Sequence, residues 1–364
     1  MEDILKYDYS ETIEYLLHWY DYNRRILPWR ENPKPYYVWV SEIMLQQTRV
    51  EAVKSYFERF ITELPTIADL AAVDDEKLMK LWEGLGYYSR ARNLKKAAIV
   101  VMEQYDGELP ADYDKLLKLP GIGSYTAGAI ASIAFSIPVP AVDGNVLRVM
   151  KRIAGSFDDI TKDKVKKELE SDLREVITKE RPGDYNQSLM ELGATVCIPN
   201  GKPLCEQCPV MHLCKAFKQG IQMQLPIKPP KKARKLEDKT VFVMEYQGNY
   251  AIHKRDDKGL LAGLWEFPNL DEKMSFEKVE NYLQEQGIKV EEITKLTKAK
   301  HIFSHIEWHM LGYYLKLKDI KELPMKDLVW VNEDEIKSIY SLPTAFDAYR
   351  KCIGNQQLEL ELEE

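Results

Sequence analysis

The stretch LLKLPGIGSYTAGAIA, residues 116–131, decides how the first part of the chain folds. Helical patterns lie on both sides of its centre, Pro-Gly-Ile-Gly, which itself favours a turn. The glycines Gly121 and Gly123 allow a sharp bend and expose backbone N–H groups at the start of the second helix, where a phosphate binds favourably. The stretch predicts either a helix-hairpin-helix that binds a nucleic-acid backbone or a plain turn between two packed helices.

Helical periodicity extends on both sides of this hairpin. Apolar side chains recur every three or four residues in four segments, at 13–20, 50–64, 91–105 and 165–176. No convincing pattern of a β-strand appears before residue 239. We therefore expect residues 1–220 to form an all-α domain.

The pattern changes after residue 220. Residues 221–238 combine prolines with basic residues and lack a helical period, which predicts an extended linker. Residues 239–355 then predict an α+β domain, and the acidic end at 356–364 predicts a frayed tail. The expected elements of this domain are two strands around a turn at 247–249, a helix at 275–286 and strands at 306–317 and 328–331.

Composition limits the class of protein. The chain has 364 residues, 45% of them hydrophobic, which is more than one core usually holds, so two domains are expected. No apolar run approaches the ~20 residues of a membrane span. The acidic N-terminus does not resemble a secretory signal, so a cytoplasmic protein without a membrane partner is expected. The net charge of −7, taken alone, argues against a nucleic-acid partner. Residues 181–235 are nevertheless basic, with nine Lys and Arg residues and three acidic residues.

Four of the five cysteines lie close together, at Cys197, Cys205, Cys208 and Cys214. The spacing C-x7-C-x2-C-x5-C suits a closed site for zinc or for an iron–sulfur cluster, and it does not choose between them. Buried thiols without a metal are the remaining alternative. Since four protein ligands leave no open position for a substrate, the metal is expected to be structural.

Two carboxylates have contrasting sequence environments. Glu42 lies between the apolar residues 38–40 and 43–45, where desolvation would raise its pKa and suit a general acid. Asp143 opens the helical stretch 144–155, a position that keeps a carboxylate ionised. The alternatives are a surface glutamate and an ordinary helix cap. Because the two residues are 101 positions apart, this reasoning does not bring them together.

Several stretches in the same order resemble a known family over nearly the whole chain. They are SEIMLQQTRV (41–50), GLGYYSRARNL (84–94), LPGIGSYTAGAI (119–130), VDGNV (142–146) and the four cysteines. They are similar to the helix-hairpin-helix DNA glycosylases of the endonuclease III superfamily, and among these to the MutY-type adenine DNA glycosylases. The first two cysteines are separated by seven residues where the family commonly has six, which lengthens a loop without removing a ligand.

The resemblance implies a fold, a cofactor and a partner. The expected fold is multidomain: an all-α six-helix-barrel glycosylase domain with a [4Fe-4S] cluster loop, followed by an α+β Nudix-like domain. The expected partner is double-stranded DNA with 8-oxoguanine:A or G:A mispairs, from which adenine is flipped into a cleft. The resemblance further implies a monomer that acts at a prokaryotic nucleoid.

The resemblance also implies the chemistry. Glu42 would protonate the adenine leaving group at N7, and Asp143 would stabilise or capture the oxocarbenium sugar, as paired carboxyls do in glycoside hydrolysis. Tyr125 and Asn145 would be the hydrogen-bonding partners that order this pair. Relatives with lyase activity carry a lysine where this chain has Tyr125, so a monofunctional glycosylase is expected.

Other residues would contact the substrate. By the resemblance, Arg25, Trp29, Arg30 and Gln187 line the adenine pocket, while Gln47 and Tyr87 enter the helix beside the lesion. Each has a structural alternative, and an aromatic residue such as Trp29 is commonly part of a core.

Residues 239–355 resemble the 8-oxoguanine-recognition domain of this family. Phe303, Ser304 and His305 match the loop that touches the oxidised guanine, where serine offers a donor and an acceptor. Nudix hydrolase activity is the rival function for this domain. It is disfavoured because Asn281 and Gln284 stand where two metal-binding acids belong.

Two further functions compete with adenine excision. An endonuclease III-like oxidised-pyrimidine glycosylase/lyase is disfavoured by Tyr125 and by the additional domain. A non-catalytic lesion-binding protein would not need the pair Glu42 and Asp143.

Overall fold

The computed structural model describes residues 7–230, 233–321, 323–325 and 327–354, which form two compact units. The helical unit spans Met1–Val73 and Arg92–Pro230, and the sheet unit spans Asp74–Ala91 and Lys231–Glu364. Part of the predicted linker, residues 231–232, and the predicted acidic tail at 356–364 lie outside the described residues.

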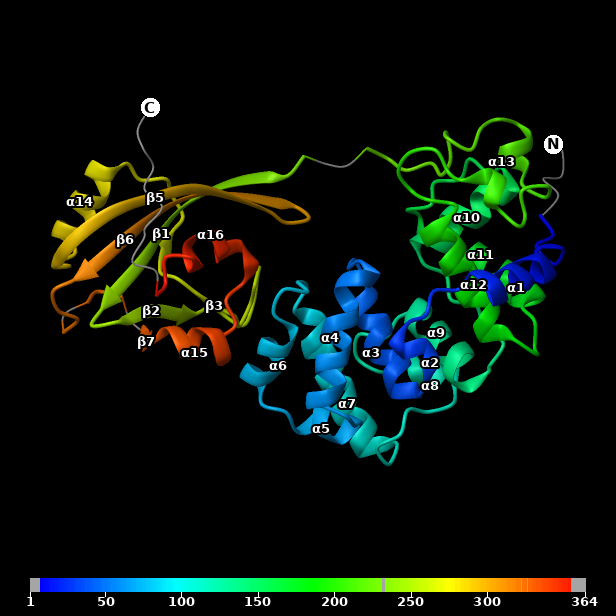
Figure 1. The fold of residues 1–364 in the computed structure, drawn as a ribbon, viewed down its shortest axis with the longest axis horizontal. Coiled ribbons are helices and arrows are strands. Elements are labelled where there is room, and N and C mark those ends of the chain that lie inside the picture. The colour runs from blue at the N-terminus through cyan, green and yellow to red at the C-terminus, as the bar shows by residue number, and fades with distance from the viewer. Residues whose placement is uncertain (1–6, 231–232, 322, 326, 355–364) are drawn as a thin grey trace. The chain divides into compact units, whose positions relative to one another are not determined.

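The helical unit confirms the all-α expectation for the first part of the chain, with each of the four periodic segments lying in a helix (Figure 1). Its helices are α1 (Thr12–Asn23), α2 (Pro28–Glu31), α3 (Pro35–Leu45), α4 (Val50–Glu63), α5 (Ile67–Ala72), most of α7 (Ser89–Gln104), α8 (Tyr113–Leu116), α9 (Ser124–Phe135), α10 (Gly144–Ala154), α11 (Asp163–Val176), α12 (Pro182–Thr195), η1 (Cys205–Gln207) and α13 (Lys215–Lys218).

Helix α10 illustrates why these segments form helices. The side chain of Asp143 accepts hydrogen bonds at its N-terminus, and Gly155 ends it in the left-handed conformation at φ 65°. Its apolar side chains recur at helical spacing and are buried. They pack in one core with residues of α1, α11 and α12, among them Leu16, Leu169 and Leu189.

Small residues let α9 approach its neighbours closely. A Cβ on Gly128 would overlap the carbonyl oxygen of Pro140. One on Gly183, in α12, would lie 2.7 Å from the carbonyl oxygen of Ser132 in α9. These close approaches hold α9, which carries Tyr125 in its first turn, against α12 and against the segment before α10.

The sheet unit confirms the α+β expectation. The main strand order is β3-β2-β1-β6-β5, with β4 paired to β1 and β7 to β2; β1 and β6 are parallel and the other pairs antiparallel. Its strands are β1 (Lys235–Tyr246), β2 (Asn249–Lys254), β3 (Trp265–Glu266), β4 (Asn269–Leu270), β5 (Val290–Ile302), β6 (Ile306–Leu317) and β7 (Val329–Val331). Its helices are α6 (Asp75–Trp82), the start of α7, α14 (Phe276–Glu285), α15 (Glu333–Ser338), η2 (Thr344–Phe346) and α16 (Asp347–Arg350).

The sheet has a core on each face because side chains alternate along a strand. Val241 and Val243 pack with residues of α15 and α16, whereas Phe242 and Met244 pack with residues of α14. Gly312 in β6 makes room for the ring of Tyr349, which a Cβ would overlap. Figure 1 shows α14 on one side of the sheet and α15 and α16 on the other.

Two features of the sheet differ from the sequence expectation. Strand β1 begins at Lys235 rather than at residue 239, because its first residues pair with β6, a strand distant in the sequence. Strand β5 was not predicted. It is rich in lysine and half exposed, so it lacks the clear apolar alternation of the other strands. The turn at Gln247-Gly248 is as predicted, with both residues at positive φ.

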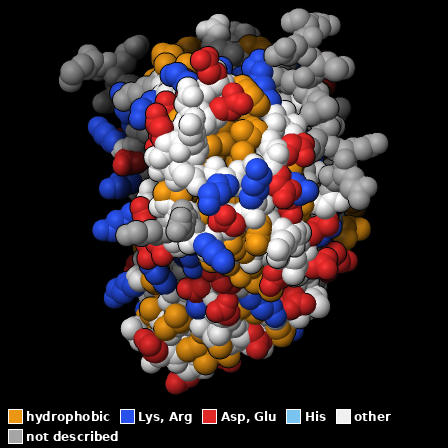
Figure 2. Space-filling view, turned by 90° about the vertical axis from the view of Figure 1, so that its left-hand side faces the viewer, with side chains coloured by type: hydrophobic (Ala, Val, Ile, Leu, Met, Phe, Trp, Pro, Cys, Tyr) orange, Lys and Arg blue, Asp and Glu red, His pale blue; other side chains and the backbone are white. Residues whose placement is uncertain are grey.

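Charged side chains cover much of the surface. On the face shown in Figure 2, basic and acidic side chains are interspersed rather than gathered by sign. Among the described residues, no helix is both long enough and apolar enough to cross a bilayer.

Candidate functional site

Glu42 lies near the end of α3, among residues that are buried. This burial was expected from the apolar residues on either side of it in the sequence. Its side chain is almost fully buried, with 5% of the residue exposed. Burial raises the pKa of Glu42 to about 7, and the nearby charge of Asp143 adds to this effect. A hydrogen bond from Tyr125 and the charge of Arg30 act in the opposite direction. At neutral pH the carboxyl can therefore hold or release a proton.

Tyr125 contacts Glu42 directly. Its Oη donates a hydrogen bond of 2.5 Å to Oε2 of Glu42 from the first turn of α9. Burial raises the pKa of Tyr125 well above its usual value, and the charge of Glu42 raises it further. The phenol therefore remains protonated and serves as a fixed donor to the carboxyl.

Asp143 has a different environment, at the N-terminus of α10. Its Oδ1 accepts hydrogen bonds of 2.8 Å from the backbone N–H groups of Asn145 and Val146. Its Oδ2 accepts one of 2.7 Å from the side-chain amide of Asn145. Three donors at the start of a helix therefore hold this carboxylate in a fixed orientation.

The fold brings these residues into one pocket of about 160 Å³ in the helical unit. The resemblance implied that Tyr125 and Asn145 order the pair of carboxyls, and in the structure Tyr125 donates to Glu42 and Asn145 to Asp143. The predicted residues that line the pocket are Arg25, Trp29, Arg30, Glu42, Tyr125, Asp143, Asn145 and Gln187. An acid held near its neutral form and a hydrogen-bonded carboxylate thus face one small space.

Glu191, which sequence reasoning missed, organises one end of this pocket. It is fully buried on α12 and accepts hydrogen bonds from Arg25 and Arg30, the latter at 2.8 Å. Burial opposes its ionisation, but the hydrogen bonds and charges of both arginines outweigh this and lower its pKa. Its position four residues after Gln187, on the same helix face, was the available sequence signal.

The remaining predicted residues of the helical unit lie outside the described lining of this pocket. Gln47 is exposed just after α3, in a left-handed conformation at φ 59° that is uncommon for a residue with a side chain. Gly121 is also left-handed, at φ 75°, and Gly123 caps the N-terminus of α9. The hairpin therefore has the geometry that the sequence predicted.

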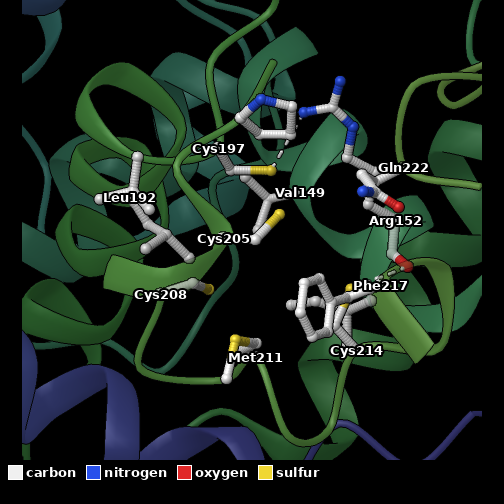
Figure 3. Close-up of a pocket in the computed structure, with 13 residues that line it drawn as sticks. Val149, Arg152, Leu192, Cys197, Cys205, Cys208, Met211, Cys214, Phe217 and Gln222 are labelled. Atoms are coloured by element: carbon white, nitrogen blue, oxygen red, sulfur yellow. Dashed lines mark hydrogen bonds between the residues drawn. The ribbon is translucent and has the colours of Figure 1, made fainter. Parts of the chain in front are cut away.

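The four clustered cysteines surround one cavity (Figure 3). No three His, Cys, Asp or Glu side chains among the described residues are grouped closely enough for a single metal ion. Four thiols that line one cavity are a donor set that fits an iron–sulfur cluster. Burial raises the pKa of the Cys208 thiol to about 12, and a bound metal would favour its thiolate form.

Helix α10 connects this cavity to the carboxylate site. The guanidinium of Arg148 donates a hydrogen bond of 3.0 Å to Oδ1 of Asn145 and another of 2.9 Å to the carbonyl oxygen of Cys197. One helical turn further along, Arg152 donates a hydrogen bond of 3.3 Å to Sγ of Cys197. One helix therefore carries Asp143 at its start and contacts a predicted cluster ligand through two arginines.

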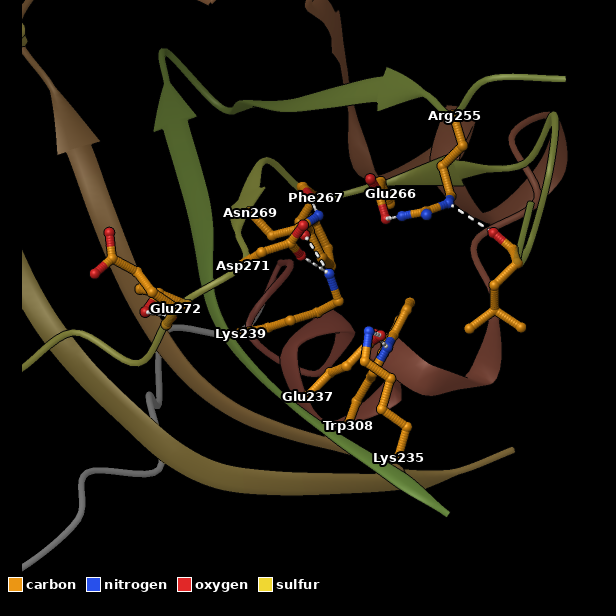
Figure 4. A network of polar contacts seen from close by, with 12 residues as sticks. Lys235, Glu237, Lys239, Arg255, Glu266, Phe267, Asn269, Asp271, Glu272 and Trp308 are labelled. Atoms are coloured by element: carbon orange, nitrogen blue, oxygen red, sulfur yellow. Dashed lines mark hydrogen bonds and ion pairs between the residues drawn. The ribbon is translucent and has the colours of Figure 1, made fainter. Parts of the chain in front are cut away.

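Tyr87 and the three residues predicted to touch the oxidised guanine, Phe303, Ser304 and His305, belong to the sheet unit. Ser304 and His305 form the exposed tip between β5 and β6, and Oγ of Ser304 lies 2.8 Å from Oη of Tyr87. Phe303 packs edge-on against Trp308 at 4.8 Å between ring centroids. The indole N–H of Trp308 in turn donates a hydrogen bond of 3.0 Å to Glu237, and the ammonium group of Lys239 lies over its ring (Figure 4). The loop thus rests on a buried, ordered platform.

Comparisons with known proteins identify the family. Residues 40–175 match the HhH-GPD superfamily of base excision DNA repair proteins, and residues 240–351 match the NUDIX domain. The adenine DNA glycosylase of Mus musculus is 37% identical over 360 residues, covering 83% of this chain and 70% of the mouse protein. The adenine DNA glycosylase of Buchnera aphidicola (from Schizaphis graminum) is 35% identical over 318 residues, covering 86% of this chain and 89% of the Buchnera protein. The chain belongs to the adenine DNA glycosylase family.

As a member of the adenine DNA glycosylase family, the chain is a DNA glycosylase of base excision repair. A solved structure of endonuclease III in a non-covalent complex with DNA is similar to it, with 29% sequence identity and a TM-score of 0.50. This likeness covers 58% of the chain and 98% of endonuclease III. The family assignment confirms the resemblance inferred from the quoted stretches.

Proposed function

We propose that this adenine DNA glycosylase family member excises adenine mispaired with 8-oxoguanine, and with guanine, from double-stranded DNA. The observation that carries the proposal is the shared pocket of Glu42 and Asp143. Its volume of about 160 Å³ suits a base and part of its sugar. One carboxyl in it has a raised pKa, and the other accepts three hydrogen bonds.

The two carboxyls divide the chemistry. Glu42, protonated near neutral pH, donates its proton to N7 of adenine, which makes the base a better leaving group. The carboxylate of Asp143 stabilises the positive charge that develops on the sugar as the glycosidic bond breaks. Tyr125 and Asn145 hold these carboxyls in place. Arg25, Trp29, Arg30 and Gln187 surround the flipped base, with Glu191 fixing the two arginines.

The reaction is hydrolytic and leaves the DNA backbone intact. No lysine is among the described residues that line the pocket, and Tyr125 occupies the position where lyase relatives carry one. Without an amine nucleophile no Schiff base forms with the sugar, so strand cleavage does not follow excision.

The cysteines Cys197, Cys205, Cys208 and Cys214 hold one [4Fe-4S] cluster. Bound there, the cluster supplies charge to neutralise the thiolates and fixes the surrounding loop. Lys202, within that loop, and Lys215 and Lys218, just after it, then lie on an ordered segment that contacts phosphates together with Gly121 and Gly123 of the hairpin.

Recognition of the opposite base belongs to the second domain. We assign glycosylase chemistry to residues 1–220 and recognition of 8-oxoguanine to residues 239–355, joined by the basic linker 221–238. Phe303, Ser304 and His305 contact the oxidised base, and Gln47 and Tyr87 enter the helix near the flipped adenine. The enzyme acts as a monomer on nucleoid DNA.

One assay tests the proposed function. Duplexes with 8-oxoguanine:A, G:A and 8-oxoguanine:C are incubated with the purified protein, then divided and analysed with and without alkali. Strand breaks at adenine of the first two duplexes, only after alkali, are the expected result. Cleavage without alkali, or excision of an oxidised pyrimidine with adenine left in place, would support the lyase alternative instead.

A further inference from the structure

We propose that a second cavity of the helical unit is a subsite for the free purine base, through which adenine leaves after excision. The inference rests on the proposed function and extends it to release of the product. This second cavity has a volume of about 650 Å³, roughly four times that of the pocket of Glu42 and Asp143, the catalytic pocket. Its lining comes from the end of α1, from α2, from the second half of α9 and from the start of α12.

The two cavities share one wall. Arg25, Arg30, Ile133 and Gln187 line both of them. Each of these side chains therefore borders the catalytic pocket as well as the second cavity. A base that lies against this shared wall after excision is separated from the second cavity by single side chains.

Two members of the shared wall are held in place, and Gln187 is not. Glu191 accepts hydrogen bonds from Arg25 and Arg30, the latter at 2.8 Å, and so fixes both guanidinium groups. Gln187 is buried, with 9% of the residue exposed, and its side-chain amide has no hydrogen-bond partner among the described residues. A buried amide without a partner is costly. Its donors and its acceptor can bind the edge of a purine from either cavity.

The second cavity lies at the end of α9 that is far from the proposed DNA contacts. Helix α9 begins just after Gly123 of the hairpin, to which we assign phosphate binding. Ile133 and Ser136 line the second cavity and follow Gly123 by ten and thirteen positions. Along a helix axis this corresponds to about 15 to 20 Å. A duplex bound at the hairpin would therefore leave the second cavity open.

The proposed chemistry makes such a route useful. Because no strand cleavage follows excision, the abasic DNA remains an intact duplex at the catalytic pocket, and the freed adenine lies behind the sugar. Release of a product limits the turnover of many enzymes. A route through the shared wall lets the base leave while the protein remains on the abasic site.

The charge of the second cavity suits an uncharged ligand. Four arginines and four acidic residues line it, so their formal charges cancel. Arg181, for example, donates hydrogen bonds to Asp184 at 2.8 Å and to Asp21 at 3.1 Å. A phosphate group would meet as many acidic as basic side chains, whereas an uncharged purine can use the donors and acceptors of both.

Release of labelled adenine tests the proposal. An 8-oxoguanine:A duplex with a radiolabelled target adenine is held on beads and bound by the protein, and excess competitor duplex then captures any protein that leaves. Excision is measured by alkaline strand cleavage, release by the label in the supernatant, and retention by the protein on the beads.

The variants fill the second cavity from two different elements. Ser136→Trp and Arg24→Trp each place an indole at its lining, and both positions are exposed and lie outside the proposed catalytic machinery. Ser55→Trp is the matched control, because Ser55 is exposed in α4 and is not among the residues that line either cavity.

In the parent, adenine should appear in the supernatant as fast as it is excised, while the protein stays on the beads. Both cavity-filling variants should excise adenine at the parental rate but release it about tenfold more slowly, because their indoles obstruct its exit. Ser55→Trp should behave like the parent. Adenine that appears only as the protein leaves the beads, or parental release rates in both cavity-filling variants, would overturn the inference.

Equilibrium dialysis separates this inference from the proposed function. Radiolabelled adenine is dialysed against the protein bound to a duplex with a stable abasic analogue opposite 8-oxoguanine. The parent should take up adenine, and both cavity-filling variants should bind it about tenfold more weakly. If the chain did not excise adenine, the bead assay would yield no product, whereas dialysis would still show whether the free base enters behind a bound duplex. No uptake by a parent that excises adenine would refute the subsite alone.

Discussion

The hydroxyl of Tyr125 donates a hydrogen bond of 2.5 Å to Oε2 of Glu42, and the two residues come from different helices. This contact stabilises the ionised carboxyl, whereas burial stabilises the neutral one. Because burial is the larger effect, the pKa of Glu42 is raised to about 7 rather than lowered. The balance between the two sets the pH range in which Glu42 can act as an acid.

The pH dependence of excision should report this balance. A general acid works when protonated, so the single-turnover rate should be high below pH 7 and fall as the pH rises through about 7. Tyr125→Phe removes a hydrogen bond that favours the ionised form, so it should move the midpoint to higher pH. Rates measured from pH 5 to 9 for both proteins test this. A midpoint that stays in place would mean that another group controls the profile.

The proposed monofunctional reaction gives a second prediction. Incubation with substrate DNA and borohydride should yield no covalent protein–DNA adduct, because Tyr125 cannot form a Schiff base. A bifunctional endonuclease III, treated in parallel with its own substrate, serves as the positive control. Efficient trapping of this chain at neutral pH would contradict the monofunctional assignment.

The cysteine cavity predicts the metal. The purified protein should be brown, absorb through thiolate-to-iron charge transfer and contain about four irons per chain. Cys208→Ser should lose most of the iron. Cys352→Ser is the matched control, because Cys352 belongs to the sheet unit and is not among the residues that line the cavity, and this variant should keep its iron. Stoichiometric zinc without iron would refute the cluster.

The charge distribution predicts a steep salt dependence despite the acidic average. Affinity for duplex DNA should fall linearly with salt on a double-logarithmic plot, with a slope set by the phosphate contacts. Replacing Lys215 and Lys218 with Gln should reduce that slope by about 1 to 2. The exposed Lys289, in the sheet unit and outside the basic segment, provides a control substitution. An unchanged slope in the double variant would place the phosphate contacts elsewhere.

Local sequence patterns predicted the parts of this fold that depend on neighbouring residues. The helices, the Pro-Gly-Ile-Gly turn and the capping position of Asp143 follow from periodicity and from backbone preferences. The raised pKa of Glu42 follows from its apolar neighbours. Each of these features is decided within a few residues of the chain, which is why the sequence reveals it.

Features decided by distant contacts were not accessible in this way. The pairing of β1 with β6 and the meeting of Glu42 with Asp143 require the folded chain. The assignment of α6 to the sheet unit depends on ion pairs with residues far along the sequence, such as that between Glu76 and Lys254. Glu191 was missed because a glutamate on a helix is ordinarily exposed, and only the approach of two arginines explains its burial.

The division of labour between Glu42 and Asp143 is the central claim, and single-turnover excision of adenine from an 8-oxoguanine:A duplex tests it most directly. Glu42→Gln should lose proton delivery and Asp143→Asn should lose charge stabilisation, each slowing the reaction by several orders of magnitude. The double variant should be little slower than either single variant, as expected for groups that act as a unit. Binding to the duplex should persist in all three. Near-normal excision at neutral pH by Glu42→Gln would contradict the account, because the acid would then be a different residue.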